Sequence, residues 1–222
     1  MRKTDAQESV KICTAVLNVL LSTVPTRGRP GSDLRTAVND FLSNAMVIIQ
    51  NDQSGPPLAD IFAKAKAAGI TYPQMDRVRQ EAAEQTPQTL GATIMQGCLI
   101  QFALATEGNV IADTTFTSRN DVEAVRQNVN TTFAPMEEIV ADNMDQAGYQ
   151  ALIALHAAIV GFLTKTAYPL PQVVNFRFAN SMPTLVTAYR LYADAGRADE
   201  LRAGNDVVHP AFMKPIGIAL SA

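Results

Sequence analysis

Apolar residues recur every three or four positions through most of the first 168 residues, with polar residues on the opposite side of each repeat. That spacing is typical of amphipathic α-helices. It predicts helices at residues 6–23, 32–50, 58–68, 73–85, 87–113, 118–134 and 145–166. The sequence therefore predicts an all-helical body over residues 1–168.

Proline and glycine divide these helices. Residues 25–31, PTRGRPG, predict a loop before the second helix, and Thr86-Pro87 predicts a cap and first turn for the fifth. Gly108 predicts a kink or a break in the fifth helix. Pro135 either kinks the sixth helix or begins a new one.

Two helices differ from the rest in composition. The fifth carries Gly91, Ala92, Gly97 and Ala103 among larger apolar residues, and small residues let helices approach closely. It is therefore the predicted central helix of the body. Residues 75–85, MDRVRQEAAEQ, mix both charge signs and predict a solvated helix face.

The pattern changes after the prolines at positions 169 and 171, which predict a stiff linker. Val174, Phe176 and Phe178 alternate with other residues, as in a half-buried strand. Two short helical segments and a second alternating run follow; their apolar positions are Leu185, Ala188, Tyr189, Tyr192, Leu201, Ile216, Ile218 and Leu220. The predicted fold class is mainly α, a helical bundle body followed by a small βααβ module of α+β type at residues 172–222.

Turn-forming residues set the expected ends of the module's elements. Ser181 is the expected cap of its first helix, and Gly196 the expected end of that helix. Gly204 and Asn205 are expected to supply left-handed conformations after the second helix. Leu201 is the one large apolar residue of that second helix, so it is the predicted anchor of the module's core.

Composition narrows the class of protein. The chain has 222 residues, of which 47% are hydrophobic and 18% charged, with a formal net charge of −3. These values are typical of an ordered globular protein. An acidic chain without a basic run is a poor candidate for nucleic-acid binding. Asp5, Glu8 and Lys11 interrupt the first apolar run, which predicts a folded helix rather than a signal peptide, and no membrane span is predicted.

Few residues carry recognisable chemistry. Cys13 and Cys98 lie in apolar helical patterns and are interpreted as core thiols. His156 is expected to be a hydrogen-bonded histidine of the interior or an interface, and His209 a turn residue. The sequence contains no nucleophile elbow, phosphate loop or zinc-protease motif. The prediction is a protein that is not an enzyme, with no catalytic residues, cofactor or metal.

Several residues of the module carry a family resemblance. Thr184-Leu185, the Tyr189–Tyr192 turn, Asp199-Glu200-Leu201, Asn205 and the closing strand together resemble a degenerate LysM module. The longer run MPTLVTAYRLYADAGRADELRAGNDVVHPAF, with YQALIALHAAIV before it, resembles the C-terminal region of the Mu-like phage DNA circularisation proteins. The resemblance covers about half the chain, from residue 117 to the end. Met213-Lys214-Pro215 stands where that family has a Gly-rich turn.

This resemblance implies a structural component of a phage tail baseplate or tail hub, made in the host cytoplasm and incorporated into the virion. It implies contacts with other tail proteins and a homo-oligomeric ring of three-fold or six-fold symmetry. The residues expected to support the module and its contacts are Leu185, Tyr189, Tyr192, Leu201, Asn205 and Phe212.

Two other functions remain open at this stage. A LysM-like module implies peptidoglycan binding, in a groove between residues 179–182 and 208–214. The family's name implies circularisation or protection of DNA ends, against which the acidic charge argues.

Overall fold

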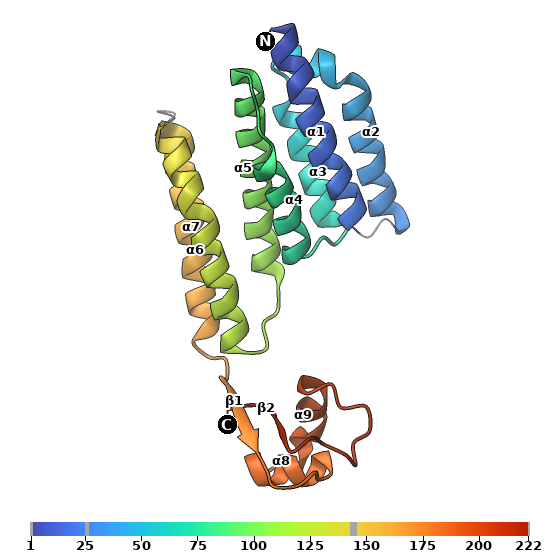
Figure 1. The fold of residues 1–222 in the computed structure, drawn as a ribbon, viewed down its shortest axis with the longest axis vertical. Helices are drawn as coiled ribbons and strands as arrows, with labels where there is room; N and C mark the ends of the chain where they lie inside the picture. The colour runs from blue at the N-terminus through green and yellow to red at the C-terminus, as the bar shows by residue number, and fades with distance from the viewer. Residues whose placement is uncertain (1, 25–26, 143–145, 222) are drawn as a thin grey trace. The chain divides into compact units, whose positions relative to one another are not determined.

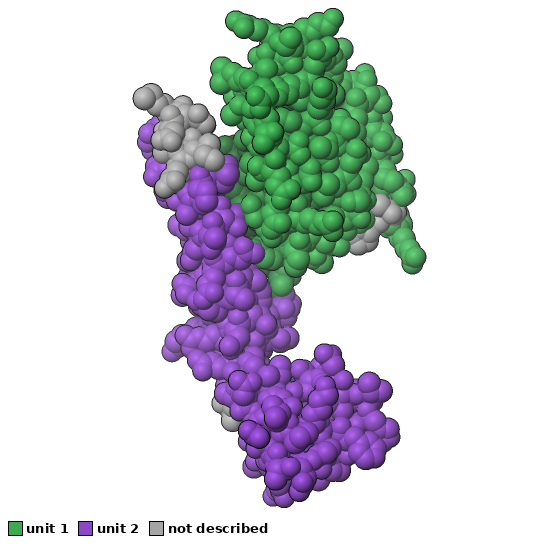
Figure 2. Space-filling model, viewed as in Figure 1, with its two compact units in different colours: residues 1–114 green, residues 115–222 purple. Residues whose placement is uncertain are grey.

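The computed structural model describes residues 2–24, 27–142 and 146–221, and these form two compact units, Met1–Thr114 and Thr115–Ala222 (Figure 2). The described residues are mostly helical, with one two-stranded antiparallel sheet (Figure 1). This confirms the predicted fold class. The body expected over residues 1–168 comprises unit 1 together with the first two helices of unit 2.

Unit 1 is a bundle of helices. Its elements are α1 (Lys3–Thr23), α2 (Gly28–Gln50), α3 (Gly55–Ala67), α4 (Tyr72–Glu84) and α5 (Leu90–Asp113). Helix α5 packs against α1, α3 and α4, so its predicted central place is confirmed. Helix α5 runs through Gly108 without the predicted break, and Gly108 is buried.

Helices α1 and α3 each begin three residues before their predicted starts at residues 6 and 58, and the starts of α2 and α5 differ as well. Helix α2 begins at Gly28 rather than at residue 32, because Pro30 lies in the first turn, where a missing N–H costs no helical bond. Pro25, in the predicted loop, lies outside the described residues. Thr89, not Thr86, caps α5, with its Oγ1 accepting the Ala92 N–H at 3.4 Å.

Unit 2 begins with a hairpin of two helices, α6 (Arg119–Asp142) and α7 (Gln146–Ala167). Ser118 Oγ accepts the Asp121 N–H at 3.2 Å and donates to the Asp121 carboxylate at 2.7 Å, so Ser118 caps α6. Helix α6 continues through Pro135. Among the described residues, Gly148–Ala167 is the one helical stretch long and apolar enough to cross a membrane, with mean hydropathy 1.3. It is not clearly a span, since it packs against α6 and includes His156 and Lys165.

The C-terminal module has the predicted βααβ order. Its elements are β1 (Val173–Arg177), α8 (Thr184–Tyr192), the 3₁₀ turn η1 (Ala195–Arg197), α9 (Ala198–Gly204) and β2 (Ile216–Leu220). The strands are antiparallel, with Val173 opposite Leu220 and Arg177 opposite Ile216. Helix α8 packs on η1 and α9, and α9 packs on β2, so the helices cover one face of the sheet.

The buried face of β2 is the opposite of the predicted one. Ile216 and Ile218 are 59% and 40% exposed, whereas Ala219 is buried and Gly217 half-buried. Phe176 lies opposite Gly217 in the register, and its large ring fills the space between the sheet and the helices. Small residues are required beside it. The alternation along β2 was therefore predicted correctly, but the residues that alternate into the core are Gly217 and Ala219 and not the isoleucines.

Three turn predictions are also wrong. Helix α8 ends at Tyr192, where Ala193 adopts the left-handed conformation with φ 56°, so Gly196 does not end it. Ser181 donates its hydroxyl to the Met213 carbonyl at 2.7 Å instead of capping α8. Neither Gly204 nor Asn205 is left-handed: Gly204 is the last residue of α9, Asn205 has φ −116°, and the left-handed residue is Asp206 at φ 50°.

Candidate functional site

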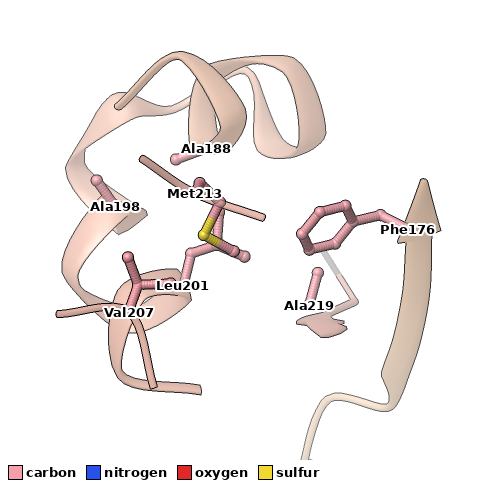
Figure 3. Close-up of a cluster of buried hydrophobic side chains, with 7 residues drawn as sticks. All are labelled: Phe176, Ala188, Ala198, Leu201, Val207, Met213 and Ala219. Carbon is pink, nitrogen blue, oxygen red and sulfur yellow. The ribbon is translucent and has the colours of Figure 1, made fainter. Parts of the chain in front are cut away.

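The core of the module is small and drawn from every one of its main elements (Figure 3). Its buried side chains are Phe176, Ala188, Ala198, Leu201, Val207, Met213 and Ala219. Leu201 is 2% exposed, so the burial predicted for it is confirmed. Phe178, Leu191 and Tyr192 pack against the cluster from its edge. With so few large side chains, the module depends on polar contacts as well.

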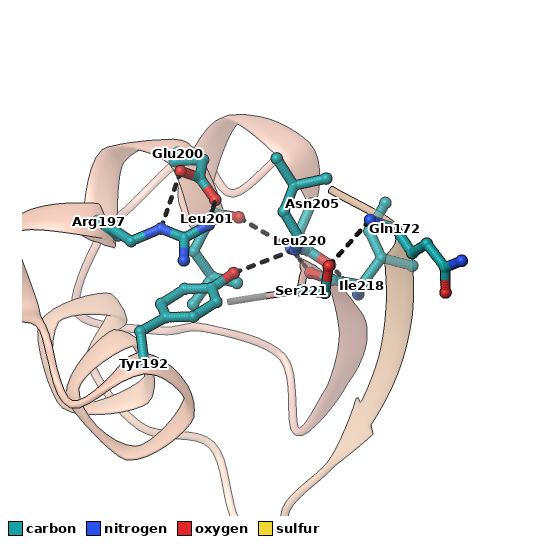
Figure 4. Close-up of polar contacts among 9 residues, drawn as sticks. All are labelled: Gln172, Tyr192, Arg197, Glu200, Leu201, Asn205, Ile218, Leu220 and Ser221. Carbon is teal, nitrogen blue, oxygen red and sulfur yellow. Dashed lines mark hydrogen bonds and ion pairs between the residues drawn. The ribbon is translucent and has the colours of Figure 1, made fainter. Parts of the chain in front are cut away.

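Asn205 connects α9 to β2 (Figure 4). Its amide nitrogen donates to the carbonyls of Leu201 at 2.8 Å and Ile218 at 2.7 Å, and its Oδ1 accepts the Ile218 N–H at 2.8 Å. The side chain therefore pairs with the outer edge of β2 as a neighbouring strand would, and it also bonds a carbonyl of α9. This is a tertiary role, different from the turn conformation that the sequence predicted.

Tyr192 closes the other part of the same edge. Its hydroxyl accepts the Leu220 N–H at 3.2 Å, and the Arg197 guanidinium lies 3.8 Å from the centre of its ring. Arg197 in turn donates to the Glu200 carboxylate at 2.8 and 3.1 Å. Burial, and then the negative charge of Glu200, raise the pKa of the Tyr192 hydroxyl. Tyr192 thus stays a neutral hydrogen-bonding group.

Gly217 is the point of closest approach between β2 and its surroundings. A Cβ built there would lie 2.3 Å from Asn205 Oδ1 and 2.8 Å from the Phe176 ring. Both neighbours are held in place, one by hydrogen bonds and the other by the core. The side chain of any residue larger than glycine must therefore displace one of them.

We expect Gly217→Ala to destabilise the module by about 2 kcal/mol, the usual cost of overpacking. The measurement is hydrogen exchange of β1 and β2 amides in the full chain. Gly204→Ala is the matched control, since a Cβ at Gly204 meets nothing within 4 Å. Equal protection in the two variants would contradict the close approach.

The six residues predicted to support the module and its contacts divide into two groups. Leu201, Asn205 and Tyr192 face inward and hold the module together, as described above. Leu185, Tyr189 and Phe212 are 59%, 64% and 71% exposed. The structure therefore does not bring the six into one site. Their predicted role in contacts with other proteins applies only to the exposed three.

The exposed three lie on two segments that are bonded to each other. Thr184, at the start of α8, donates its N–H to the Pro210 carbonyl at 2.7 Å and its hydroxyl to the same oxygen at 3.1 Å. Met182 and Met213 form an antiparallel bridge. The bonds hold the loop carrying Phe212 against the start of α8, which carries Leu185. We call Leu185, Tyr189 and Phe212 the apolar surface of the module.

The same bonds join the two segments of the predicted sugar groove. Residues 179–182 and 208–214 pair through the Met182–Met213 bridge, and Ser181 bonds the Met213 carbonyl. A separate hollow of about 310 Å³ lies beside β2, between the start of α6 and the module. Its lining residues are Thr117, Ser118, Asp121, Val173, Tyr192, Glu200, Leu201, Ala203, Gly204, Ile218, Ala219 and Leu220.

The two histidines take structural positions. His156 bonds Glu137 at 2.7 Å through Nδ1 and Asn130 at 2.9 Å through Nε2, and its ring stacks on Phe133. This agrees with a hydrogen-bonded histidine. His209 Nδ1 accepts the Ala211 N–H at 3.2 Å, which confirms the predicted turn role.

The two cysteines are free thiols. Cys13 is fully buried and Cys98 is partly buried, in agreement with core positions. Burial raises the pKa of the Cys13 thiol to about 12 and raises the pKa of Cys98 as well. Both are therefore protonated and weakly reactive at neutral pH. The described residues contain no group of histidine, cysteine or carboxylate side chains that could hold a metal ion.

Unit 1 contains a buried charge cluster that the sequence interpretation missed. Glu107 of α5 is 2% exposed, and its Oε1 lies 3.3 Å from Arg79 Nε on α4. Arg79 also pairs with Asp76. The Tyr72 hydroxyl, Arg79 Nε and Glu107 Oε1 are buried without a hydrogen bond among the described residues, so the Arg79–Glu107 contact is a charge contact without hydrogen-bond geometry. The Arg79 guanidinium therefore lies beside two acidic side chains, those of Asp76 and Glu107.

The electrostatics of this cluster follow from burial. Desolvation raises the pKa of Glu107 from 4.5 to about 8, with Arg79 opposing the shift and Asp76 adding to it. Burial also raises the pKa of Tyr72, to which Glu107 and Asp76 contribute. The proton on Glu107 balances the charge: with Glu107 neutral, Arg79 and Asp76 form a one-to-one pair.

A sequence signal for this cluster existed. Glu107 stands four residues from both Ala103 and Ile111, which are buried, so it lies on the apolar side of α5. Asp76 and Arg79 lie beside the buried Met75 and Val78, so the predicted solvated face of α4 is only partly solvated. An acidic residue inside an apolar helical pattern is a useful marker of a buried charge.

No protein-family model matches the sequence, and no curated protein matches it either. The resemblance to the phage tail family therefore rests on the residues quoted for it and stays a prediction.

Proposed function

We propose that this protein is a structural component of a phage tail baseplate or tail hub, acting through protein–protein contacts rather than catalysis. The observation that supports this most is the apolar surface of the module. Leu185, Tyr189 and Phe212 point outward although the module already has a closed core. Exposed clusters of large apolar side chains are typical of interaction sites.

The resemblance of residues 117–222 to the Mu-like DNA circularisation proteins supplies the particular assembly. On this proposal the apolar surface docks onto a neighbouring tail protein, and repeated copies close into a ring of three-fold or six-fold symmetry. Aromatic and aliphatic anchors of this kind contribute most of the binding free energy at protein interfaces.

The test is incorporation into purified tail particles of the phage that encodes the chain. We expect the wild-type chain in washed particles at a constant copy number, measured by quantitative mass spectrometry. The double variant Leu185→Asp with Phe212→Asp should be lost from them, since it places two charges in the contact. Arg190→Asp, an exposed change on the same helix, is the matched control and should be retained.

Circular dichroism of the free variants separates misfolding from lost contact. Absence of the wild-type chain from washed particles would overturn the proposed function. Retention of the double variant would show that another surface makes the contact.

A further inference from the structure

The two edges of the module's sheet are treated differently by the fold. A strand at the edge of a sheet presents unpaired N–H and C=O groups that accept another strand. In β2 three outward groups have side-chain partners: Asn205 bonds the N–H and C=O of Ile218, and Tyr192 accepts the Leu220 N–H. No described residue bonds the outward groups of Ile216. Side chains of the module therefore cover the middle of the β2 edge, at Ile218 and the Leu220 N–H (Figure 4).

The outer edge of β1 is covered at one end only. The Asn120 side chain accepts the Val173 N–H at 2.8 Å, and the Arg119 N–H donates to the Pro171 carbonyl at 2.9 Å. Two backbone hydrogen bonds lie at the two ends of the ladder with β2. The Ser221 N–H donates to the Gln172 carbonyl, and the Phe178 N–H donates to the Pro215 carbonyl. The backbone N–H and C=O groups point to alternate sides along a strand. Those of Val174 and Phe176 therefore also point toward β2, while those of Asn175 and Arg177 point outward.

The outward groups of these two residues are open. No described residue bonds the N–H or C=O that Asn175 or Arg177 directs away from β2, and Arg177 has no ion-pair partner among the described residues. Val174, on the same strand, is 42% exposed although it lies on the helix-facing side of the sheet. The open stretch thus combines four free backbone groups with a partly exposed apolar side chain.

We propose that the open edge of β1 pairs with the same edge of a second copy of this chain, antiparallel about a two-fold axis beside Phe176. The pairing sets Asn175 of each copy opposite Arg177 of the other, which makes four backbone hydrogen bonds. It places Val174 beside the second copy's Phe178, on the helix-facing side. The two sheets become one four-stranded sheet.

Three features favour a second copy as the occupant. The open stretch is self-complementary, because its two outward residues match each other when one strand is reversed. Antiparallel pairing sets Arg177 against asparagine, whereas parallel pairing in register sets the two arginines side by side. The covered end at Pro171 and Val173 falls beyond Arg177 of the other copy, where that strand has ended. The covered end of one copy therefore does not lie opposite the paired strand of the other.

This inference is independent of the proposed tail function, which concerns the apolar surface on α8 and the loop. The test is sedimentation equilibrium of the full chain under reducing conditions. We expect reversible dimers at protein concentrations up to roughly 1 mM, the range of weak associations. Asn175→Pro should weaken dimerisation by about tenfold or more, since it removes one outward N–H per copy but no bond within the ladder.

Asn175→Ala is the matched control, since it changes the same side chain but keeps the N–H, and it should dimerise like the wild type. A monomeric wild-type chain would overturn the inference, and so would equal association of the proline and alanine variants. If the proline variant is misfolded by circular dichroism, hydrogen exchange of the wild type decides. Exchange at Asn175 and Arg177 must slow as concentration rises, and dimers without that protection contradict the paired edge.

Discussion

Replacing Glu107 with glutamine is expected to remove most of the pH dependence of the stability of unit 1. The pKa of Glu107 is raised to about 8 in the folded chain, so the folded state holds this proton more tightly than the unfolded state. The stability from this difference is fully present below about pH 4.5 and is lost as the pH rises through about 8. The free energy of unfolding of wild-type unit 1 should therefore decrease as the pH rises from about 4.5 to about 8.

The size of the effect follows from the buried position. A raised pKa of this kind corresponds to roughly 3 kcal/mol after allowance for relaxation around the charge. At about pH 5 the variant and wild type should be similar, because glutamine resembles the neutral acid. At about pH 9 the variant should be more stable by roughly 3 kcal/mol. Arg79 retains Asp76 as its partner in both forms.

The measurement is urea unfolding at the two pH values, followed by NMR signals from α4 and α5. Glu84→Gln is the matched control, since it makes the same chemical change at an exposed position of α4 and should leave the pH dependence intact. A stability that is independent of pH in the wild type would show that Glu107 is not buried against Arg79.

Replacing Asn205 with alanine is expected to destabilise the C-terminal module by about 3 kcal/mol, since three hydrogen bonds are lost at roughly 1 kcal/mol each. The loss is larger than a turn residue alone would cause. The outward N–H and C=O of Ile218 both lose their partner, and the Leu201 carbonyl of α9 loses its side-chain donor. Exchange of β2 amides should accelerate, and the freed edge should make the chain prone to aggregation.

Hydrogen exchange of the full chain, resolved over residues 173–220, measures this change. The control is Asn180→Ala, which removes an exposed asparagine in the turn after β1. Similar exchange in the two variants would mean that the Asn205 bonds contribute little. Asn205→Asp should be intermediate, since it keeps the acceptor for the Ile218 N–H but loses both amide donations.

Helical periodicity predicted the helices of the body well, because each buries one stripe of regular spacing. The starts were less accurate. Proline in the first turn of α2 was interpreted as part of a loop, and Thr86 rather than Thr89 was predicted to cap α5. Local patterns do not show which residue the rest of the fold holds in place. In α5 the choice depends on Glu8 of α1, which bonds the Thr89 hydroxyl at 2.6 Å.

The candidate sites were harder to predict than the fold. Exposure of Leu185 and Tyr189 could not be separated from core packing, since both produce apolar residues at helical spacing, and Phe212 lies in a loop that has no such spacing. The closed and open edges of the sheet depend on Asn205, Tyr192 and Asn120, which reach their partners from distant positions. Hydrogen bonds of this kind leave no pattern in the sequence.

By itself, the amino-acid sequence determined the mainly helical class, the βααβ order of the module and the anchoring place of Leu201, because each depends on local spacing of apolar side chains. Only the tertiary structure decided which face of β2 is buried, that Asn205 pairs with a strand edge, and that Glu107 shares Arg79 with Asp76. These features arise where segments far apart in the chain meet, and the free energy of burial depends on what each side chain meets there.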